Sequence, residues 1–336
     1  MSQLLPNPTN PSSDELAAAL KLVRAGEITH KQSATPDWTT TCASTSTSAP
    51  REVKLAIYDP AGLAKTTPRP VVLNWHGSGF VVPRFGADAD CNRWLVEELK
   101  NVTVVDGDYV KAPEYAFPEA LYDVVGAVKW VVAQPWFDGN LVVKGHSAGA
   151  NFALVLASRT TAMSLGLTPD EYACIKASVT LYPPTDSTIP VEQKKTNEHG
   201  EEAGIPMAPL SADVIRFFFG CYLGFGSEQD QIEKAKDPRV SPAYAATESY
   251  EVPCYIIACE HDPLAAEAER FAHTLMKHNA KHEYYFAHGV GHGYETRIPD
   301  VRAANVLDVP GGKAKVESYA QMLAFIRKNV PTVQKA

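Results

Sequence analysis

The sequence contains no long apolar run. None of its hydrophobic stretches approaches the roughly 18 residues that a helix needs to cross a bilayer. The first seven residues, Met-Ser-Gln-Leu-Leu-Pro-Asn, have neither the basic start nor the apolar centre of a secretory signal. These absences predict a cytoplasmic protein that does not act at a membrane.

Cysteine is scarce and scattered. The 6 cysteines lie far apart, and no two of them form a Cys-x-x-Cys pair. This spacing indicates neither a zinc site nor a disulfide framework, so we expect reduced thiols in the core. No metal or other cofactor is predicted.

Charge of one sign is not concentrated anywhere in the chain. Lys and Arg total 31 against 39 for Asp and Glu, which gives a formal net charge of −8. A dispersed acidic surface does not favour nucleic acid as a partner. The length of 336 residues and the hydrophobic share of 45% allow one large domain with a modest appendage.

Short apolar runs alternate with helical patterns along most of the chain. We predict strands at 53–58, 71–75, 102–105, 141–143, 177–181, 255–258 and 283–286, and helices at 14–26, 92–100, 119–133, 150–157, 211–223 and 316–329. The first two strands are expected to form a hairpin, and the Thr/Ser-rich stretch 35–50 to be a connector or a short edge strand. The alternation predicts an α/β fold with a mainly parallel sheet and helices on both faces.

The most informative motif is Gly-His-Ser-Ala-Gly at 145–149. It lies between an apolar strand and a helical stretch, which is the context of a nucleophile elbow. Strand and helix nearly touch at such a turn, and Gly145 and Gly149 have no side chains to obstruct the contact. The motif therefore predicts Ser147 as a nucleophile.

A second small-residue motif, His-Gly-Ser-Gly, begins at His76 directly after a predicted strand. Such a loop lets backbone N–H groups approach an oxygen that becomes negative during acyl transfer. The candidate oxyanion hole comprises Gly77, Ser78, Gly79 and Ala148, and the N–H groups of the last three are the expected donors. The alternative is a glycine-rich turn without function. His76 itself is expected to be structural, with its ring bonded to backbone groups so that it shapes the loop.

A nucleophilic serine needs a histidine as base and a carboxylate that orients it. Asp262 follows the strand 255–258 and is the candidate acid, with Glu260 as the alternative. His292 and His288 are the two candidate bases. Although the two histidines have the spacing of metal ligands on a helix, the three glycines around them predict a loop, so a metal site is not expected.

Together the motifs resemble those of the hormone-sensitive-lipase-like carboxylesterases, a branch of the α/β-hydrolase superfamily, from about residue 53 to 329. Besides the two motifs above, the resemblance rests on Asp-Tyr-Val-Lys-Ala-Pro-Glu at 108–114, Asp-Pro-Arg-Val-Ser-Pro at 237–242 and the His-Gly-Tyr that begins at His292. The chain departs from the family pattern at Ser78, His146 and Ala150, where the family has Gly, Asp and Gly.

The resemblance implies an α/β-hydrolase fold in which residues 51–330 form the catalytic domain. Residues 1–50 and an insertion at about 185–225 would form a helical cap, with the polar stretch 190–209 as a mobile lid edge. The Asp-Pro-Leu context favours Asp262 over Glu260, and the His-Gly-aromatic context favours His292 over His288. The implied activity is hydrolysis of small to medium carboxylic esters through an acyl-enzyme.

Five residues are candidates for the substrate pocket: Phe80, His146, Phe217, Phe218 and Tyr222. The alternative for the phenylalanines is that they only pack the cap onto the sheet. Two other functions stay open. One is a lyase or cyclase that uses the same pocket. The other, which is less favoured, is a binding protein, because relatives that became receptors have lost the base that His292 would supply. The expected partner is a small-molecule ester, and the expected state a monomer or homodimer.

Overall fold

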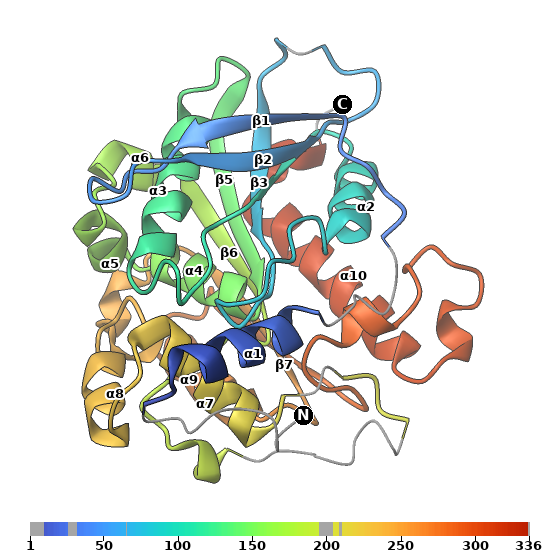
Figure 1. Cartoon of the computed structure of the whole chain (residues 1–336). Coiled ribbons are helices and arrows are strands. Elements are labelled where there is room, and N and C mark those ends of the chain that lie inside the picture. Colours follow the sequence, from blue (N-terminus) through green and yellow to red (C-terminus); the bar gives the residue numbers. More distant parts are fainter. Residues whose placement is uncertain (1–9, 26–31, 65, 195–203, 208–209, 335–336) are drawn as a thin grey trace.

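The computed structural model describes residues 10–25, 32–64, 66–194, 204–207 and 210–334 (Figure 1). Its centre is an eight-stranded sheet with the order β1-β2-β4-β3-β5-β6-β7-β8. The strands are β1 (Trp38–Ala43), β2 (Glu52–Tyr58), β3 (Arg69–Trp75), β4 (Thr103–Gly107), β5 (Phe137–His146), β6 (Ile175–Leu181), β7 (Cys254–Cys259) and β8 (Glu283–Ala287). β2 is antiparallel to β1 and β4, and the strands from β4 to β8 are parallel to one another. The predicted mainly parallel α/β sheet is confirmed.

The predicted hairpin between the first two of the expected strands, now β2 and β3, is wrong, because β4 lies between them in the sheet. All seven residues of β3 are buried, as in a central strand with a neighbour on each side. Asp59, in the expected turn, instead fastens the start of the sheet: its Oδ1 accepts hydrogen bonds from Arg69 at 2.9 Å and from Thr103 at 2.7 Å. These bonds hold the beginnings of β3 and β4 together.

The Thr/Ser-rich stretch contains β1, the edge strand that was one of its two predicted forms. β1 pairs along its whole length with β2. Among the described residues, these are the only two strands that follow each other in the chain and pair in antiparallel fashion. The sheet therefore begins at Trp38, ahead of residue 51, where the catalytic domain was expected to start.

Helices cover both faces of the sheet (Figure 1). They are α1 (Ser13–Arg24), α2 (Ala89–Leu99), α3 (Glu119–Val132), α4 (Ala148–Ala157), α5 (Arg159–Ser164), α6 (Pro169–Ala173), α7 (Ala212–Leu223), α8 (Glu228–Ala235), α9 (Ala265–His278) and α10 (Gly312–Asn329). The buried side chains form two apolar clusters, one with α3, α4 and α9 and the other with α2 and α10. In the described part of the chain, no helix is long and apolar enough to cross a membrane.

α1 is fastened to the body of the molecule by its last residue. The Arg24 guanidinium donates to the Glu114 carboxylate at 2.6 and 2.7 Å and to the carbonyl oxygens of Val81 and Ala112. Ser12 caps the start of α1 and forms a capping box with Glu15. α1 and α7 thus lie over the same end of the sheet (Figure 1). Most of the expected lid edge, at 195–203 and 208–209, lies outside the described residues.

Candidate active site

Ser147 occupies the sharp turn between β5 and α4, with φ at 50° and ψ at −117°. A Cβ on Gly145 would lie 2.2 Å from the carbonyl carbon of Gly149, and a Cβ on Gly149 would lie 2.0 Å from the carbonyl oxygen of Trp75. Both contacts are with backbone, which cannot swing aside. The two glycines let strand and helix close around Ser147, whose backbone is held at a positive φ while its side chain stays partly buried.

The side chains of Ser147, His292 and Asp262 form a continuous chain of hydrogen bonds. Ser147 Oγ lies 2.8 Å from His292 Nε2, and His292 Nδ1 lies 2.8 Å from Asp262 Oδ2. The Asp262 side chain is only 1% exposed, and its other oxygen accepts the Leu264 N–H at 2.9 Å. Because the carboxylate accepts, Nδ1 carries the proton and Nε2 is left to accept the proton of Ser147.

The two alternative residues lie together outside this array. The Glu260 carboxylate accepts the Gly289 N–H at 2.8 Å, and its Oε2 lies 3.6 Å from Nδ1 of His288. The His288 side chain is 76% exposed. The structure thus brings Asp262 and His292 to Ser147, and leaves Glu260 and His288 at the surface.

The loop after β3 faces the serine. A Cβ on Gly77 would lie 3.2 Å from the Ser147 Cβ. Within the described ranges, no protein acceptor takes the backbone N–H groups of Ser78, Gly79 or Ala148. Three donors without protein acceptors beside a serine hydroxyl form an arrangement that can bind a developing oxyanion.

A buried hydroxyl pair supports this loop. The Ser78 Oγ lies 2.6 Å from the Tyr109 hydroxyl, which donates to the His76 carbonyl oxygen at 2.7 Å. The fully buried His76 ring stacks on Tyr109, and its Nδ1 lies 3.1 Å from the Gly77 carbonyl oxygen. His76 contacts the backbone of its own loop, as its position in the motif predicted.

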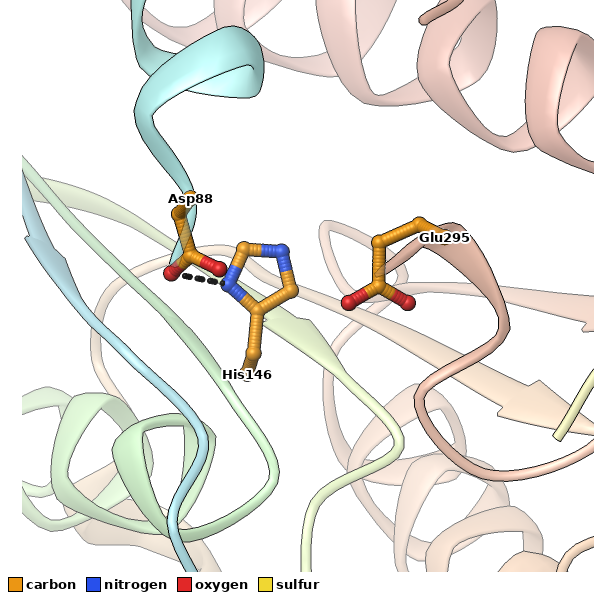
Figure 2. Close-up of side chains that lie close together, drawn as sticks. All are labelled: Asp88, His146 and Glu295. Carbon is orange, nitrogen blue, oxygen red and sulfur yellow. Dashed lines mark ion pairs between the residues drawn. The ribbon is translucent and has the colours of Figure 1, made fainter. Parts of the chain in front are cut away.

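A polar cluster surrounds His146, the residue before Ser147, and Figure 2 shows the His146 ring between the side chains of Asp88 and Glu295. His146 Nδ1 is 2.8 Å from Asp88 Oδ2, and both side chains are buried. Asn74 donates to Asp88 at 2.9 Å and to Asp106 at 2.7 Å, while Lys144 donates to Asn74 at 2.8 Å. The family has an acid where this chain has His146, and Asp88 supplies a carboxylate to that position from a different loop.

The two acids of this cluster, Asp88 and Asp106, differ in their pKa values. Burial, and then repulsion by Asp88, raises the pKa of Asp106 to about 8, so that its carboxyl is mostly protonated at neutral pH. Burial alone would raise the pKa of Asp88 as well, but attraction by His146 and Lys144 holds it below its usual value. Asp88 therefore carries the negative charge of this pair of acids.

Asp88, His146 and Glu295 place possible ligand atoms within 4.8 Å of one another (Figure 2). A divalent cation would need both carboxylates and a free imidazole nitrogen. Lys144 Nζ already lies 3.5 Å from His146 Nε2 and supplies a positive charge there. The donor set therefore fits a metal poorly.

The catalytic cavity, as we call the hollow around Ser147, measures about 250 Å³. Of the five candidate pocket residues, His146 and Phe218 line it. Phe80, Phe217 and Tyr222 do not: they belong to the apolar core and are at most 4% exposed. Phe80 and Tyr222 stack face to face at 4.0 Å, which uses their ring faces in packing α7 onto the body.

Six further residues of the cavity wall come from the predicted motifs: Gly77, Ser78, Gly79, Ser147, His292 and Gly293. The rest of the wall belongs to no motif and comprises Val23, Val82, Arg84, Ala87, Asp88, Tyr182, Leu210, Val214, Glu295, Thr296 and Arg297. Val23 comes from α1, and the residues from Glu295 onwards follow His292 in the next turn of chain. Apart from His292, the only titratable residue of the wall that gave a signal in the sequence was His146, through its departure from the family pattern.

Comparison with known proteins places this geometry in a family. A family model described as the alpha/beta hydrolase fold matches residues 72–296. The chain is 30% identical over 261 residues to esterase LipI of Mycobacterium tuberculosis, with 73% of this chain and 75% of that protein covered. It is 26% identical over 228 residues to an ethyl acetate hydrolase of Pseudomonas putida, with 66% and 65% covered.

Solved structures agree with the family model. An esterase of Pyrobaculum calidifontis aligns with a TM-score of 0.66 at 25% identity, over 94% of this chain and 91% of that one. The family model covers more than half of the chain, so the resemblance predicted from the motifs is confirmed. The chain belongs to the α/β-hydrolase family, in the hormone-sensitive-lipase-like branch that its motifs indicated.

Proposed function

We propose that this protein is a serine carboxylesterase that works through an acyl-enzyme. The observation that carries the proposal is the hydrogen-bonded array of Ser147, His292 and Asp262, in which each of the two bonds measures 2.8 Å. Beside it lie the backbone N–H groups of the oxyanion loop and of Ala148, which no acceptor in the described part of the chain takes. The esterases among its relatives support the same reaction class. Its location in the cytoplasm stays a prediction from the sequence.

The first half of the reaction forms the acyl-enzyme and releases the alcohol. Ser147 Oγ attacks the carbonyl carbon of the ester as its proton passes to His292 Nε2. Asp262 stabilises the imidazolium that forms. The carbonyl oxygen becomes negative and is bound by the N–H groups of Ser78, Gly79 and Ala148, after which His292 protonates the leaving alcohol. An acyl group then remains on Ser147.

In the second half, water replaces the alcohol. His292 takes a proton from the water as it attacks the acyl carbon, and returns that proton to Ser147 Oγ when the acid leaves. A cavity of about 250 Å³ restricts the ester to small or medium size. Phe218, whose ring lies against Gly79, closes the cavity next to the oxyanion loop.

The test is hydrolysis of para-nitrophenyl esters from acetate to laurate. Wild type should cleave the short chains, and Ser147→Ala should lower kcat by roughly 10⁶ while the protein stays folded. His292→Ala should lose activity to a similar extent. The matched control is His288→Ala, which should keep full activity because that ring lies at the surface.

Two results would contradict the proposal. If Ser147→Ala retained turnover while His292→Ala lost it, the pocket would perform base chemistry without a nucleophile, as in a lyase or cyclase. If wild type cleaved no ester in the series, hydrolysis of simple esters would be excluded.

A further inference from the structure

The catalytic cavity is lined by two chemically different sets of side chains. The apolar lining consists of Val23 of α1, Val82, Leu210, and Val214 and Phe218 of α7. The charged lining consists of charged or titratable side chains: Arg84, Asp88, His146, Glu295 and Arg297. Ser147 and His292 line the same cavity, so an ester positioned for attack would lie in a space that both sets enclose.

The two carboxylates of the charged lining, those of Asp88 and Glu295, already have hydrogen-bond partners. Asp88 accepts from Asn74 at 2.9 Å and lies 2.8 Å from the His146 ring. Glu295 accepts the hydroxyl hydrogen of Tyr182. Neither carboxylate forms an ion pair with Arg84.

Arg84, unlike these carboxylates, has no hydrogen-bond partner for its side chain among the described residues. Its guanidinium forms no hydrogen bond or ion pair with any residue in the described ranges, although its side chain is partly buried in the cavity wall. Burial, and then repulsion by the neighbouring Arg297, lowers the pKa of Arg84. A guanidinium carries five N–H donors in a planar fork that matches a carboxylate. An anionic ligand would satisfy these donors and offset the repulsion between the two arginines.

We propose that the catalytic cavity takes esters that carry a carboxylate, and that Arg84 binds this carboxylate while the apolar lining contacts the rest of the molecule. The inference rests on the proposed esterase function and specifies its substrate class. A charge-assisted hydrogen bond of this kind contributes about one power of ten or more to affinity. Arg84 is then a specificity-determining residue, separate from the groups that perform the chemistry.

The test uses two pairs of isosteric esters. In the first pair the acyl part ends in a carboxylate: the mono-para-nitrophenyl ester of glutaric acid is compared with the ester in which an isopropyl group replaces that carboxylate. In the second pair the alcohol part carries the charge: the butanoate ester of 4-hydroxybutanoic acid is compared with its isopropyl counterpart, and acid release is followed by titration. The two pairs show which side of the scissile bond faces Arg84.

We expect wild type to prefer the charged member of at least one pair by about tenfold or more in kcat/KM. Arg84→Met should abolish that preference, because it should lower kcat/KM for the charged member about tenfold or more relative to the neutral member. Arg84→Lys should restore part of the preference, because a lysine keeps the charge but not the fork. The matched control is Arg159→Met, since Arg159 pairs with Glu251 at the surface, away from the cavity wall.

Binding gives a readout that does not depend on turnover. The same esters can be titrated calorimetrically into Ser147→Ala, with and without Arg84→Met. The inference is overturned if neither pair shows a preference for the charged member that Arg84→Met removes. Failure of the esterase proposal would be seen separately, as an absence of Ser147-dependent cleavage of the neutral esters.

Discussion

The hydroxyl groups of Ser78 and Tyr109 lie 2.6 Å apart inside the loop that faces the nucleophile. Tyr109 donates to the His76 carbonyl oxygen, which can only accept, so the proton between the two hydroxyls comes from Ser78. The family motif that this loop resembles has glycine at position 78. Here the extra side chain ties the loop to a buried ring rather than obstructing it.

Tyr109→Phe should therefore lower kcat and leave KM nearly unchanged. The ring would remain, but Ser78 and the His76 carbonyl would lose their partner, and the oxyanion donors would be held less firmly. We expect a loss of about tenfold in kcat, which is less than removal of a donor itself would cause. Steady-state kinetics on para-nitrophenyl butyrate would measure it.

Tyr172→Phe is the control for this variant, because the Tyr172 hydroxyl also donates to a buried carbonyl, that of Ala157, at 2.9 Å but far from the loop. It should cost similar stability and leave kcat unchanged. An equal loss of kcat in the two variants would show that Tyr109 acts only through general stability.

Gly145→Ala should damage both stability and activity. The new Cβ would lie 2.2 Å from the backbone of Gly149, so β5 and α4 would have to separate and Ser147 would move away from His292. Overpacking of this kind costs about 3 kcal/mol of the free energy of unfolding. Urea denaturation and ester hydrolysis would record the two losses.

The control for Gly145→Ala is Gly226→Ala, whose Cβ would lie 3.7 Å from its nearest neighbour. It should leave both quantities within about 0.5 kcal/mol of wild type. If Gly145→Ala behaved like this control, close packing of strand and helix would not be what positions Ser147.

Most of the sheet could be predicted because the centre of a buried parallel strand appears as a short apolar run, as at residues 71–73 of β3, whose residues are all buried. Which strands pair could not be predicted. The turn after β2 has the composition of a hairpin turn, yet Asp59 bonds to Arg69 and Thr103, and such a long-range contact leaves no mark in a short stretch of sequence.

The same division holds for the site. Ser147, Asp262 and His292 lie in motifs whose spacing reflects local geometry, so they could be identified. The cavity wall could not be, because it depends on how α1 and α7 dock. Phe217 and Phe218 are adjacent in sequence, yet one is buried in the core and the other lines the cavity.

Lys194→Met should destabilise the fold, more strongly at high pH. Lys194 pairs with Glu267, and both side chains are at most 3% exposed. Glu267 also accepts the Thr185 N–H at 3.0 Å. Burial raises the pKa of Glu267 even though Lys194 opposes the shift. Without Lys194 its ionisation would be more costly, and we expect a loss of about 3 kcal/mol at neutral pH.

The sign of the pH dependence follows from that raised pKa. The folded protein holds a proton on Glu267 that the unfolded chain releases, so stability is lost as pH rises above the unfolded value. Urea unfolding at pH 5 and pH 8 should show the larger loss at pH 8. Lys313→Met, which removes an exposed pair with Glu317, is the control and should change stability by less than about 0.5 kcal/mol. Equal effects of the two variants would exclude a structural role for the buried pair.

His282 should make the fold sensitive to acid. Its side chain is buried at 2% exposure, and its Nδ1 accepts the Cys254 N–H at 3.1 Å. Burial, aided by repulsion from His278, lowers the pKa of His282 to about 4. An unfolded chain would bind a proton there near pH 6.5, so between about pH 6.5 and 4 the unfolded state takes up a proton that the folded state refuses.

Stability should therefore fall as pH falls through that window, by about 2 to 3 kcal/mol from this group alone. His282→Asn keeps an acceptor for the Cys254 N–H but cannot be protonated, so its denaturation midpoint should change less between pH 7 and pH 4.5. His273→Asn, at an exposed position of α9, should follow the wild-type curve. If His282→Asn followed that curve too, the acid sensitivity would not arise from His282.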